Sequence, residues 1–226
     1  MRCLSDGAPG GNSVSSPAPE YILLRGEDPS QVPLILFHGS NGSEVDLLPL
    51  AQRLTPSGAH LGVRGTVRLP DGHAFFRRHP DRRIDEDDLR ARIPGLEAFI
   101  RVIHDDLGCV RPVAVGFSNG AITAAALLML HADLLSGAVL FRPLSPFVTP
   151  PLSNLDGLPV LVLDGAHDER RSPGDGFRCA QGLAAMGADV THHVVPATHA
   201  LTDRDERLAI AWLRRTSITR PEAVSQ

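Results

Sequence analysis

Short apolar runs alternate with longer segments of helical period along most of this chain, and this alternation restricts the fold more than any other feature. Continuous apolar runs of about four to six residues are typical of strands that are buried on both faces. The runs are 32–37, 113–117, 138–141, 160–163 and 190–195, with a weaker one at 66–69. Strands that alternate with helices favour an α/β fold, with a mostly parallel sheet and helices on both of its faces.

Four of the segments between these runs are predicted to be helices. One helix, expected to begin near Pro94, carries an apolar stripe made of Leu96, Phe99, Ile100, Ile103 and Leu107. The segment 121–131 is apolar almost all round, which is typical of a helix packed deep against a sheet. Two further helices are expected at 173–186 and 202–213. Thr202 is the expected cap of the last helix, whose inward side chains are predicted to be Leu208, Ala211 and Trp212.

The chain has 226 residues, enough for one domain with a large core. We interpret residues 1–19, which are rich in Gly, Ser and Pro, as a disordered tail, 20–216 as a single domain, and 217–226 as a flexible tail. The first segment has no apolar run that would suggest a secretory signal or a membrane anchor. The widely spaced Cys3, Cys109 and Cys179 form no CxxC pair, which favours a reducing compartment and a cytoplasmic protein.

Charge and histidine content exclude several classes of function. With 22 basic and 26 acidic residues the net charge is −4, which gives no basic footprint for nucleic acid or for an anionic membrane. The ten histidines include no HExxH pair, and no metal or cofactor is expected. The acidic cluster at 85–88 is interpreted as a capped helix start rather than a cation site.

A GxSxG sequence at 116–120 is the strongest chemical signal. It falls where a predicted strand ends and a predicted helix begins, an arrangement that presents a serine on a strained turn. Glycines are expected on both sides of Ser118 because a side chain there would collide with the neighbouring strand and helix. Ser118 is therefore the candidate nucleophile, and a structural serine in a tight turn is the alternative.

A serine nucleophile requires a histidine base and an acid that orients it, in the chain order serine, acid, histidine. Asp168 follows the run 160–163, and His199 follows the run 190–195, so we assign them as acid and base. Asp164 competes as the acid. The other candidate bases are His192 and His193, but consecutive strand residues point to opposite faces of a sheet.

Two backbone N–H groups are needed to stabilise the oxyanion. One should belong to Asn119, which follows the nucleophile, and the other to Ser40 in the loop after the strand 32–37, with Asn41 as second choice. His38, at the start of this loop, is predicted to hold the loop by hydrogen bonding.

These motifs resemble, in the same order, the phospholipase/carboxylesterase family of α/β-hydrolases. The matching segments are 38–39, 41–42, 46–50, GFSNG at 116–120, GAHD at 165–168 and ATHAL at 197–201. Four further segments resemble a bacterial branch of this family whose members are small cytoplasmic esterases. They are 64–65, 71–72, 75–78 and 85–89. The resemblance, over about residues 30 to 215, implies carboxylic-ester hydrolysis through an acyl-serine, a sheet of about seven strands without a large lid, and often a homodimer.

Two positions depart from the family pattern. Thr198 stands before the candidate histidine, where the family usually has glycine, and Glu169-Arg170-Arg171 replaces the usual aliphatic or proline turn after the acid. The first departure concerns the approach of the loop that carries Thr198 to Ser118, and the second concerns the local substrate surface. Candidate substrate contacts are Asn41, Phe75, Arg77, Arg78 and Arg142, and the three arginines are considered either as a clamp for an anionic group or as partners in ordinary salt bridges.

The sequence thus predicts a serine hydrolase that cleaves small carboxylic esters, with Ser118, Asp168 and His199 as its triad. Its partner is expected to be a small-molecule ester. Two alternatives stay open at this point: an acyl thioesterase or lysophospholipase activity, and a ligand-binding module that keeps the hydrolase fold without catalysis.

Overall fold

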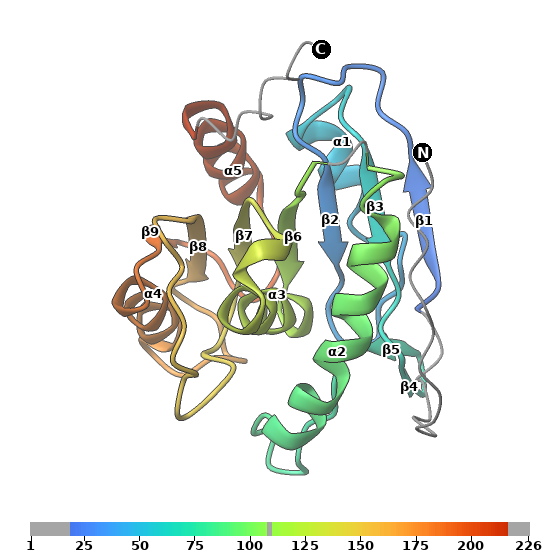
Figure 1. Cartoon of the computed structure of the whole chain (residues 1–226). Helices are drawn as coiled ribbons and strands as arrows, with labels where there is room; N and C mark the ends of the chain where they lie inside the picture. The colour runs from blue at the N-terminus through green and yellow to red at the C-terminus, as the bar shows by residue number, and fades with distance from the viewer. Residues whose placement is uncertain (1–18, 108–109, 217–226) are drawn as a thin grey trace, which may run out of the picture.

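The computed structural model of this chain describes residues 19–107 and 110–216, and its centre is a seven-stranded sheet. The strand order is β1-β3-β2-β6-β7-β8-β9, with β1 antiparallel to β3 and every other neighbouring pair parallel (Figure 1). The strands are β1 (Tyr21–Leu24), β2 (Leu34–Phe37), β3 (His60–Val63), β6 (Val113–Phe117), β7 (Gly137–Phe141), β8 (Pro159–Gly165) and β9 (Asp189–Val195). This confirms the predicted mostly parallel sheet of about seven strands.

Helices cover both faces of the sheet, as predicted. They are α1 (Leu48–Leu54), α2 (Glu86–Ile103), α3 (Asn119–Leu130), α4 (Asp175–Ala185) and α5 (Asp203–Arg215). Buried side chains of α2, α3 and α4 belong to one core layer, and those of α1 and α5 belong to the other. Figure 1 shows α2, α3 and α4 on one side of the strands and α1 and α5 beyond them.

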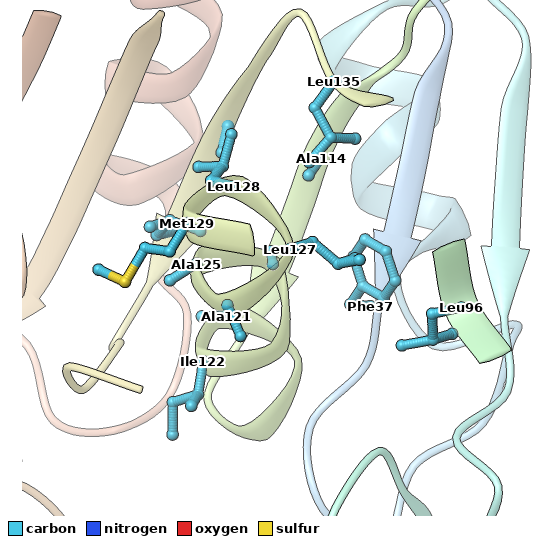
Figure 2. Close-up of a cluster of buried hydrophobic side chains, with 14 of the residues drawn as sticks. Phe37, Leu96, Ala114, Ala121, Ile122, Ala125, Leu127, Leu128, Met129 and Leu135 are labelled. Carbon is cyan, nitrogen blue, oxygen red and sulfur yellow. The ribbon is translucent and has the colours of Figure 1, made fainter. Parts of the chain in front are cut away.

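The two core layers are built from alternate residues of the central strands. In β2, Leu34 and Leu36 join the layer under α1 and α5, whereas Ile35 and Phe37 join the layer under α2 and α3. Successive strand side chains point to opposite faces, so a continuous apolar run fills both layers at once. Helix α3 is buried along nearly its whole length, and Figure 2 shows side chains of α3 beside Phe37, Leu96 and Ala114.

Helix α2 begins earlier than the sequence stripe suggested. The prediction of a start near Pro94 is wrong, because the helix begins at Glu86 and Pro94 lies inside it. The Asp85 side chain accepts a hydrogen bond from the Asp88 N–H at 3.0 Å and caps the helix, and three acidic residues follow in its first turn. Acidic side chains stabilise a helix start through the helix dipole, which confirms the interpretation of this cluster as a cap.

Helix α5 confirms the predicted cap and corrects one buried position. Thr202 and Asp205 form a reciprocal capping box. The inward residues are Asp205, Ala209 and Trp212, which recur at i, i+4 and i+7, so the expectation that Ala211 points inward is wrong. Ala211 is exposed because it lies on the opposite side of the helix from this row.

Five short elements were not predicted, namely β1, β3, α1, β5 (Gly72–Ala74) and the 3-10 helix η1 (Ala132–Leu134). The weak run near 66–69 does form a strand, β4 (Val67–Leu69), but it pairs with β5 (Gly72–Ala74) in a separate two-stranded sheet. No helix within the described ranges is long and apolar enough to cross a membrane. The described residues do not include 1–18, Cys109 or 217–226, so the two tails stay predictions. The homodimer also stays a prediction.

Candidate active site

Ser118 sits on a strained turn between β6 and α3. Its backbone has φ 54° and ψ −107°, a region that residues other than glycine rarely adopt. A Cβ atom built on Gly116 would lie 2.6 Å from the Ala121 Cα, and one on Gly120 would lie 2.0 Å from the Phe37 carbonyl oxygen. The predicted need for glycine at both positions is therefore confirmed, because the turn presses directly against β2 and α3.

The parallel strands bring three sequence-distant side chains together at their carboxyl ends. Ser118 follows β6, Asp168 lies in the turn after β8, and His199 follows β9. The Ser118 Oγ lies 2.9 Å from His199 Nε2, and His199 Nδ1 lies 2.7 Å from Asp168 Oδ2. These contacts join residues that are 81 and 31 positions apart in the chain.

The hydrogen bonds define the direction in which a proton can move. An ionised Asp168 accepts from the Nδ1–H of His199, which leaves Nε2 as an acceptor for the Ser118 hydroxyl. Asp168 Oδ1 also accepts the Arg170 N–H at 2.9 Å, and its side chain is only 1% exposed. Burial lowers the pKa of His199, Asp168 opposes this, and the neighbouring Arg171 and Arg170 add to the lowering. The imidazole is thus kept in its basic form at neutral pH.

The competing acid Asp164 and the competing base His192 lie outside this hydrogen-bonded chain. Asp164 Oδ2 lies 2.7 Å from His192 Nε2, so these two residues pair with each other. A Cβ on Gly176 would meet the Asp164 carboxylate at 1.8 Å, which shows that this pair is packed against the start of α4. Burial raises the pKa of Asp164, although its contact with His192 opposes the shift. Neither Asp164 nor His192 is hydrogen-bonded to Ser118 or His199 in the part of the chain that the structure describes.

Asn119, one of the two candidate oxyanion residues, directly follows Ser118 and begins α3. Asn119 is fully buried, and its side chain accepts the Phe75 N–H at 2.8 Å and donates to the Phe76 carbonyl at 3.3 Å. Phe75, expected to contact substrate, is instead 2% exposed, so its role is to hold Asn119. This is a correction, and its physical reason is that the Phe75 ring packs against Phe37 and His38 inside the core.

The loop that carries Ser40 is held as predicted. His38 is buried, its Nε2 accepts the Gly65 N–H at 2.9 Å, and its Nδ1 donates to the Gly39 carbonyl at 2.6 Å. Burial lowers the pKa of His38, which keeps this neutral tautomer. A Cβ on Gly39 would lie 2.9 Å from the Phe117 ring, so the loop lies against the residue that precedes Ser118. Asn41 follows with a left-handed backbone, φ 61°, and is exposed.

The three arginines suggested as a substrate clamp have three different environments. Arg77 is exposed and forms a salt bridge with Asp88 at 3.0 Å, the ordinary role that the sequence allowed for. Arg78 lines a surface cleft together with Arg171. Arg142 is fully buried, so the expectation that it contacts substrate is corrected.

All five N–H donors of Arg142 are used inside the protein. The guanidinium donates to Asp205 at 2.7 and 2.8 Å, and to the carbonyls of Leu163, Thr198 and Ala200 at 3.0 to 3.1 Å. Thr198 and Ala200 are the neighbours of His199 in the chain. Arg142 and Asp205 therefore hold the histidine loop, a role that the sequence analysis missed. The spacing of Thr202 and Asp205 is typical of a helix cap, but nothing in the sequence indicated that the Asp205 carboxylate would pair with Arg142.

Arg171 is a second residue that the sequence analysis did not place at the site. Its Nη2 donates to the Ser118 Oγ at 3.2 Å and to the Arg142 carbonyl at 2.6 Å, and its Nε donates to the same carbonyl at 2.9 Å. The only signal in the sequence was the departure from the family pattern after Asp168. Among the residues described, no group of three or more His, Cys, Asp and Glu side chains could hold a metal ion.

The strand order, the strained serine turn and the positions after β8 and β9 define an α/β-hydrolase. MhqD of Bacillus subtilis (strain 168), a protein assigned as a hydrolase, is 33% identical over 187 residues, which cover 82% of this chain and 94% of MhqD. The chain belongs to the phospholipase/carboxylesterase family of α/β-hydrolases, in its bacterial carboxylesterase-like branch.

Solved structures agree with this placement. The crystal structure of the Bacillus cereus carboxylesterase has a TM-score of 0.83 and 34% identity and covers 87% of this chain and 94% of its own. The carboxylesterase from Mesorhizobium loti has a TM-score of 0.82 and 29% identity, with the same coverage of both chains. No protein-family model matches the sequence.

Proposed function

We propose that this protein is a serine esterase that hydrolyses small carboxylic esters through an acyl-serine intermediate. The observation that carries the proposal is the continuous hydrogen-bonded chain from Asp168 through His199 to Ser118, with distances of 2.7 and 2.9 Å. This chain contains the three groups that nucleophilic acyl transfer requires: a nucleophile, a base and an orienting acid.

In the first half-reaction, the Ser118 Oγ attacks the ester carbonyl carbon while its proton passes to His199 Nε2. Asp168 stabilises the imidazolium that forms and keeps the ring in its reactive tautomer. The negative charge on the carbonyl oxygen is stabilised by the backbone N–H groups of Ser40 and Asn119 and by the N-terminal end of α3, which begins at Asn119. When the tetrahedral intermediate collapses, the imidazolium returns its proton to the leaving alcohol, and the acyl group stays on Ser118.

In the second half-reaction, water takes the place of the alcohol. His199 removes a proton from the water as the oxygen attacks the acyl carbon, and the proton then passes to Ser118 Oγ as the acid product leaves. The lowered pKa of His199 supports this role because the ring is unprotonated and ready to act as a base at neutral pH. The carboxylesterases of Bacillus cereus and Mesorhizobium loti, both similar to this chain, support an ester as the substrate.

The proposal is tested by hydrolysis of p-nitrophenyl acetate and butyrate. Ser118→Ala is expected to reduce kcat/KM at least about a thousandfold, which corresponds to about 4 kcal/mol of lost transition-state stabilisation. Ser30→Ala, which alters an exposed serine bonded only to Asp28, is the matched control and should retain full activity. Undiminished turnover in Ser118→Ala would refute the assignment.

Two further measurements separate this function from its alternatives. A fluorophosphonate probe should form an adduct on Ser118, whereas a non-catalytic binding module would give no adduct. A series of p-nitrophenyl esters and acyl-CoA thioesters from acetyl to palmitoyl should show the highest kcat/KM for short oxygen esters. A maximum at palmitoyl or at the thioesters would instead indicate the thioesterase or lysophospholipase activity.

A further inference from the structure

Four arginines share a surface cleft that Arg171 connects to the candidate nucleophile. Arg78, Arg82, Arg170 and Arg171 all line one surface cleft of about 700 Å³. Arg171 links this cleft to the reaction centre because its Nη2 donates to the Ser118 Oγ at 3.2 Å. A group bound at Arg171 would therefore lie close to a carbonyl carbon under attack by Ser118.

The position of Arg171 is defined by its own contacts. Two of its N–H groups point to the Arg142 carbonyl, and Nη1 donates to the Arg170 carbonyl at 3.1 Å. With the bond to Ser118, four of its five donors are used, and one N–H on Nη1 is left. Arg78 uses one donor, Nη1, on the Arg82 carbonyl at 2.7 Å, which leaves four of its five for a ligand.

The acidic residues of the cleft do not neutralise these four arginines. The cleft is lined by six arginines and by four acidic residues, an excess of two positive charges. Asp81 pairs with Arg83, and Asp175 pairs with Arg178. Of the other two acids, Glu86 accepts the Val148 N–H, and Glu169 is exposed on the rim.

The four arginines therefore keep a positive charge that the nearby carboxylates compensate only in part. No ion pair within 4 Å joins Arg78, Arg82, Arg170 or Arg171 to a carboxylate in the described part of the chain. Burial, together with repulsion from Arg78, lowers the pKa of Arg171 to about 10, although Asp168 and Asp175 oppose the shift. The group still carries its charge at neutral pH. Like charges held together in this way favour the binding of an anion.

We propose that the enzyme prefers esters that carry an additional ionised carboxylate, which binds to Arg78 and Arg171 in this cleft. This inference rests on the proposed esterase function and names its substrate class. The planar guanidinium of Arg78 suits a carboxylate because its free donors can form two parallel hydrogen bonds, and Arg171 can add one from its remaining Nη1–H. The partly buried, apolar Leu144 also lines the cleft and would pack against the short chain between the ester and the carboxylate.

The test compares matched substrates with and without the charge. On the acyl side, mono-p-nitrophenyl glutarate is compared with p-nitrophenyl pentanoate. On the alcohol side, 4-carboxyphenyl butyrate is compared with 4-carbamoylphenyl butyrate. The wild-type kcat/KM is expected to favour the carboxylate by about tenfold or more on one of the two sides, and this preference should weaken as salt is added.

Variants then assign the preference to the cleft. Arg78→Gln should reduce the ratio of kcat/KM for the charged ester to kcat/KM for the uncharged ester by about tenfold. The change should fall mainly on KM for the charged ester, because Arg78 has no hydrogen bond to Ser118 in the described structure. Arg171→Gln should also reduce the ratio, and Arg171→Lys should restore part of it by returning the charge. Arg25→Gln, which alters an exposed arginine outside the cleft, is the matched control and should leave the ratio and the activity unchanged.

The outcomes distinguish this inference from the esterase proposal. Equal rates for charged and uncharged esters, or a ratio that Arg78→Gln does not change, would overturn the anion preference while the esterase function stands. Failure of the wild-type protein to hydrolyse any of these esters would instead refute the esterase function. If Arg171→Gln does not fold, Arg78→Gln and the salt dependence still decide the question.

Discussion

Replacing Asp205 with asparagine should destabilise the whole protein and disturb the candidate histidine at the same time. Arg142 and Asp205 form a salt bridge with side chains that are 0% and 1% exposed. Asp205→Asn leaves the charge of Arg142 buried and unpaired, because an amide carries no negative charge and offers only one acceptor atom. Breaking a buried pair in this way typically costs about 3–5 kcal/mol, a large fraction of the 5–15 kcal/mol by which domains are usually stable.

The same pair explains why activity should fall in the molecules that remain folded. Arg142 holds the carbonyls of Thr198 and Ala200 on either side of His199, so a relaxed guanidinium would let the imidazole move. A displacement of about 1 Å can reduce the rate about a hundredfold. We therefore expect a lower kcat for p-nitrophenyl butyrate per folded molecule, with the folded fraction determined by circular dichroism.

The sign of the pH dependence gives a further check on Asp205. Burial opposes ionisation of Asp205, but hydrogen bonds from Arg142 and Thr202 outweigh it and lower the pKa of Asp205 in the folded state. Because the pKa of Asp205 is lower in the folded state than in the unfolded state, its ionised carboxylate stabilises the folded protein at pH values above the unfolded pKa of about 3.9. This stabilisation is lost as the pH falls through the pKa of the folded state. Wild-type stability should therefore fall more steeply below about pH 4 than that of Asp205→Asn.

Urea unfolding at neutral pH measures the effect, with Asp203→Asn as the matched control. Asp203 lies in the same first helical turn but is exposed, so its replacement should cost no more than about 1 kcal/mol through the helix dipole. A loss of less than about 1 kcal/mol in Asp205→Asn would refute the reasoning, because it would mean that the buried charge of Arg142 is tolerated without its partner.

Two more predictions concern the base and the nucleophile turn. Because burial lowers the pKa of His199, kcat/KM for p-nitrophenyl butyrate should fall on the acid side with an apparent pKa below the ordinary value of about 6.5. An apparent pKa above that value would contradict His199 as the partly buried base. Gly120→Ala should lower the free energy of unfolding by about 1–3 kcal/mol, because its Cβ would lie 2.0 Å from the Phe37 carbonyl oxygen. The control Gly182→Ala meets no atom within 4 Å in α4 and should be neutral or stabilising in thermal unfolding; equal effects at the two positions would refute the packing argument.

Periodicity in the sequence was enough to predict the central strands, but it failed for elements that depend on their neighbours. The strand 113–117 matches β6 at both ends, since a continuous apolar run can be buried only between two helical layers. β3, with the sequence HLGV, is fully buried although it contains a histidine and a glycine. The His60 Nε2 is within hydrogen-bond distance of the Thr55 carbonyl and hydroxyl, and this contact lets a polar residue lie in the core.

Local sequence determined where the candidate nucleophile, acid and base stand in this chain. The turn around Ser118 is encoded by its own glycines, and Asp168 and His199 follow apolar runs that can only be buried strands. Parallel strands end at one edge of a sheet, so these three positions were predictable before any coordinates.

Only the tertiary structure decided which charged groups surround them. Nothing in the sequence around Arg142 or Arg171 indicates the partner of its guanidinium. In the structure, Arg142 is buried against Asp205, whereas Arg171 donates to Ser118. The physical reason is that backbone periodicity depends on neighbours along the chain, whereas the environment of a long, flexible guanidinium depends on which distant segments the sheet brings beside it.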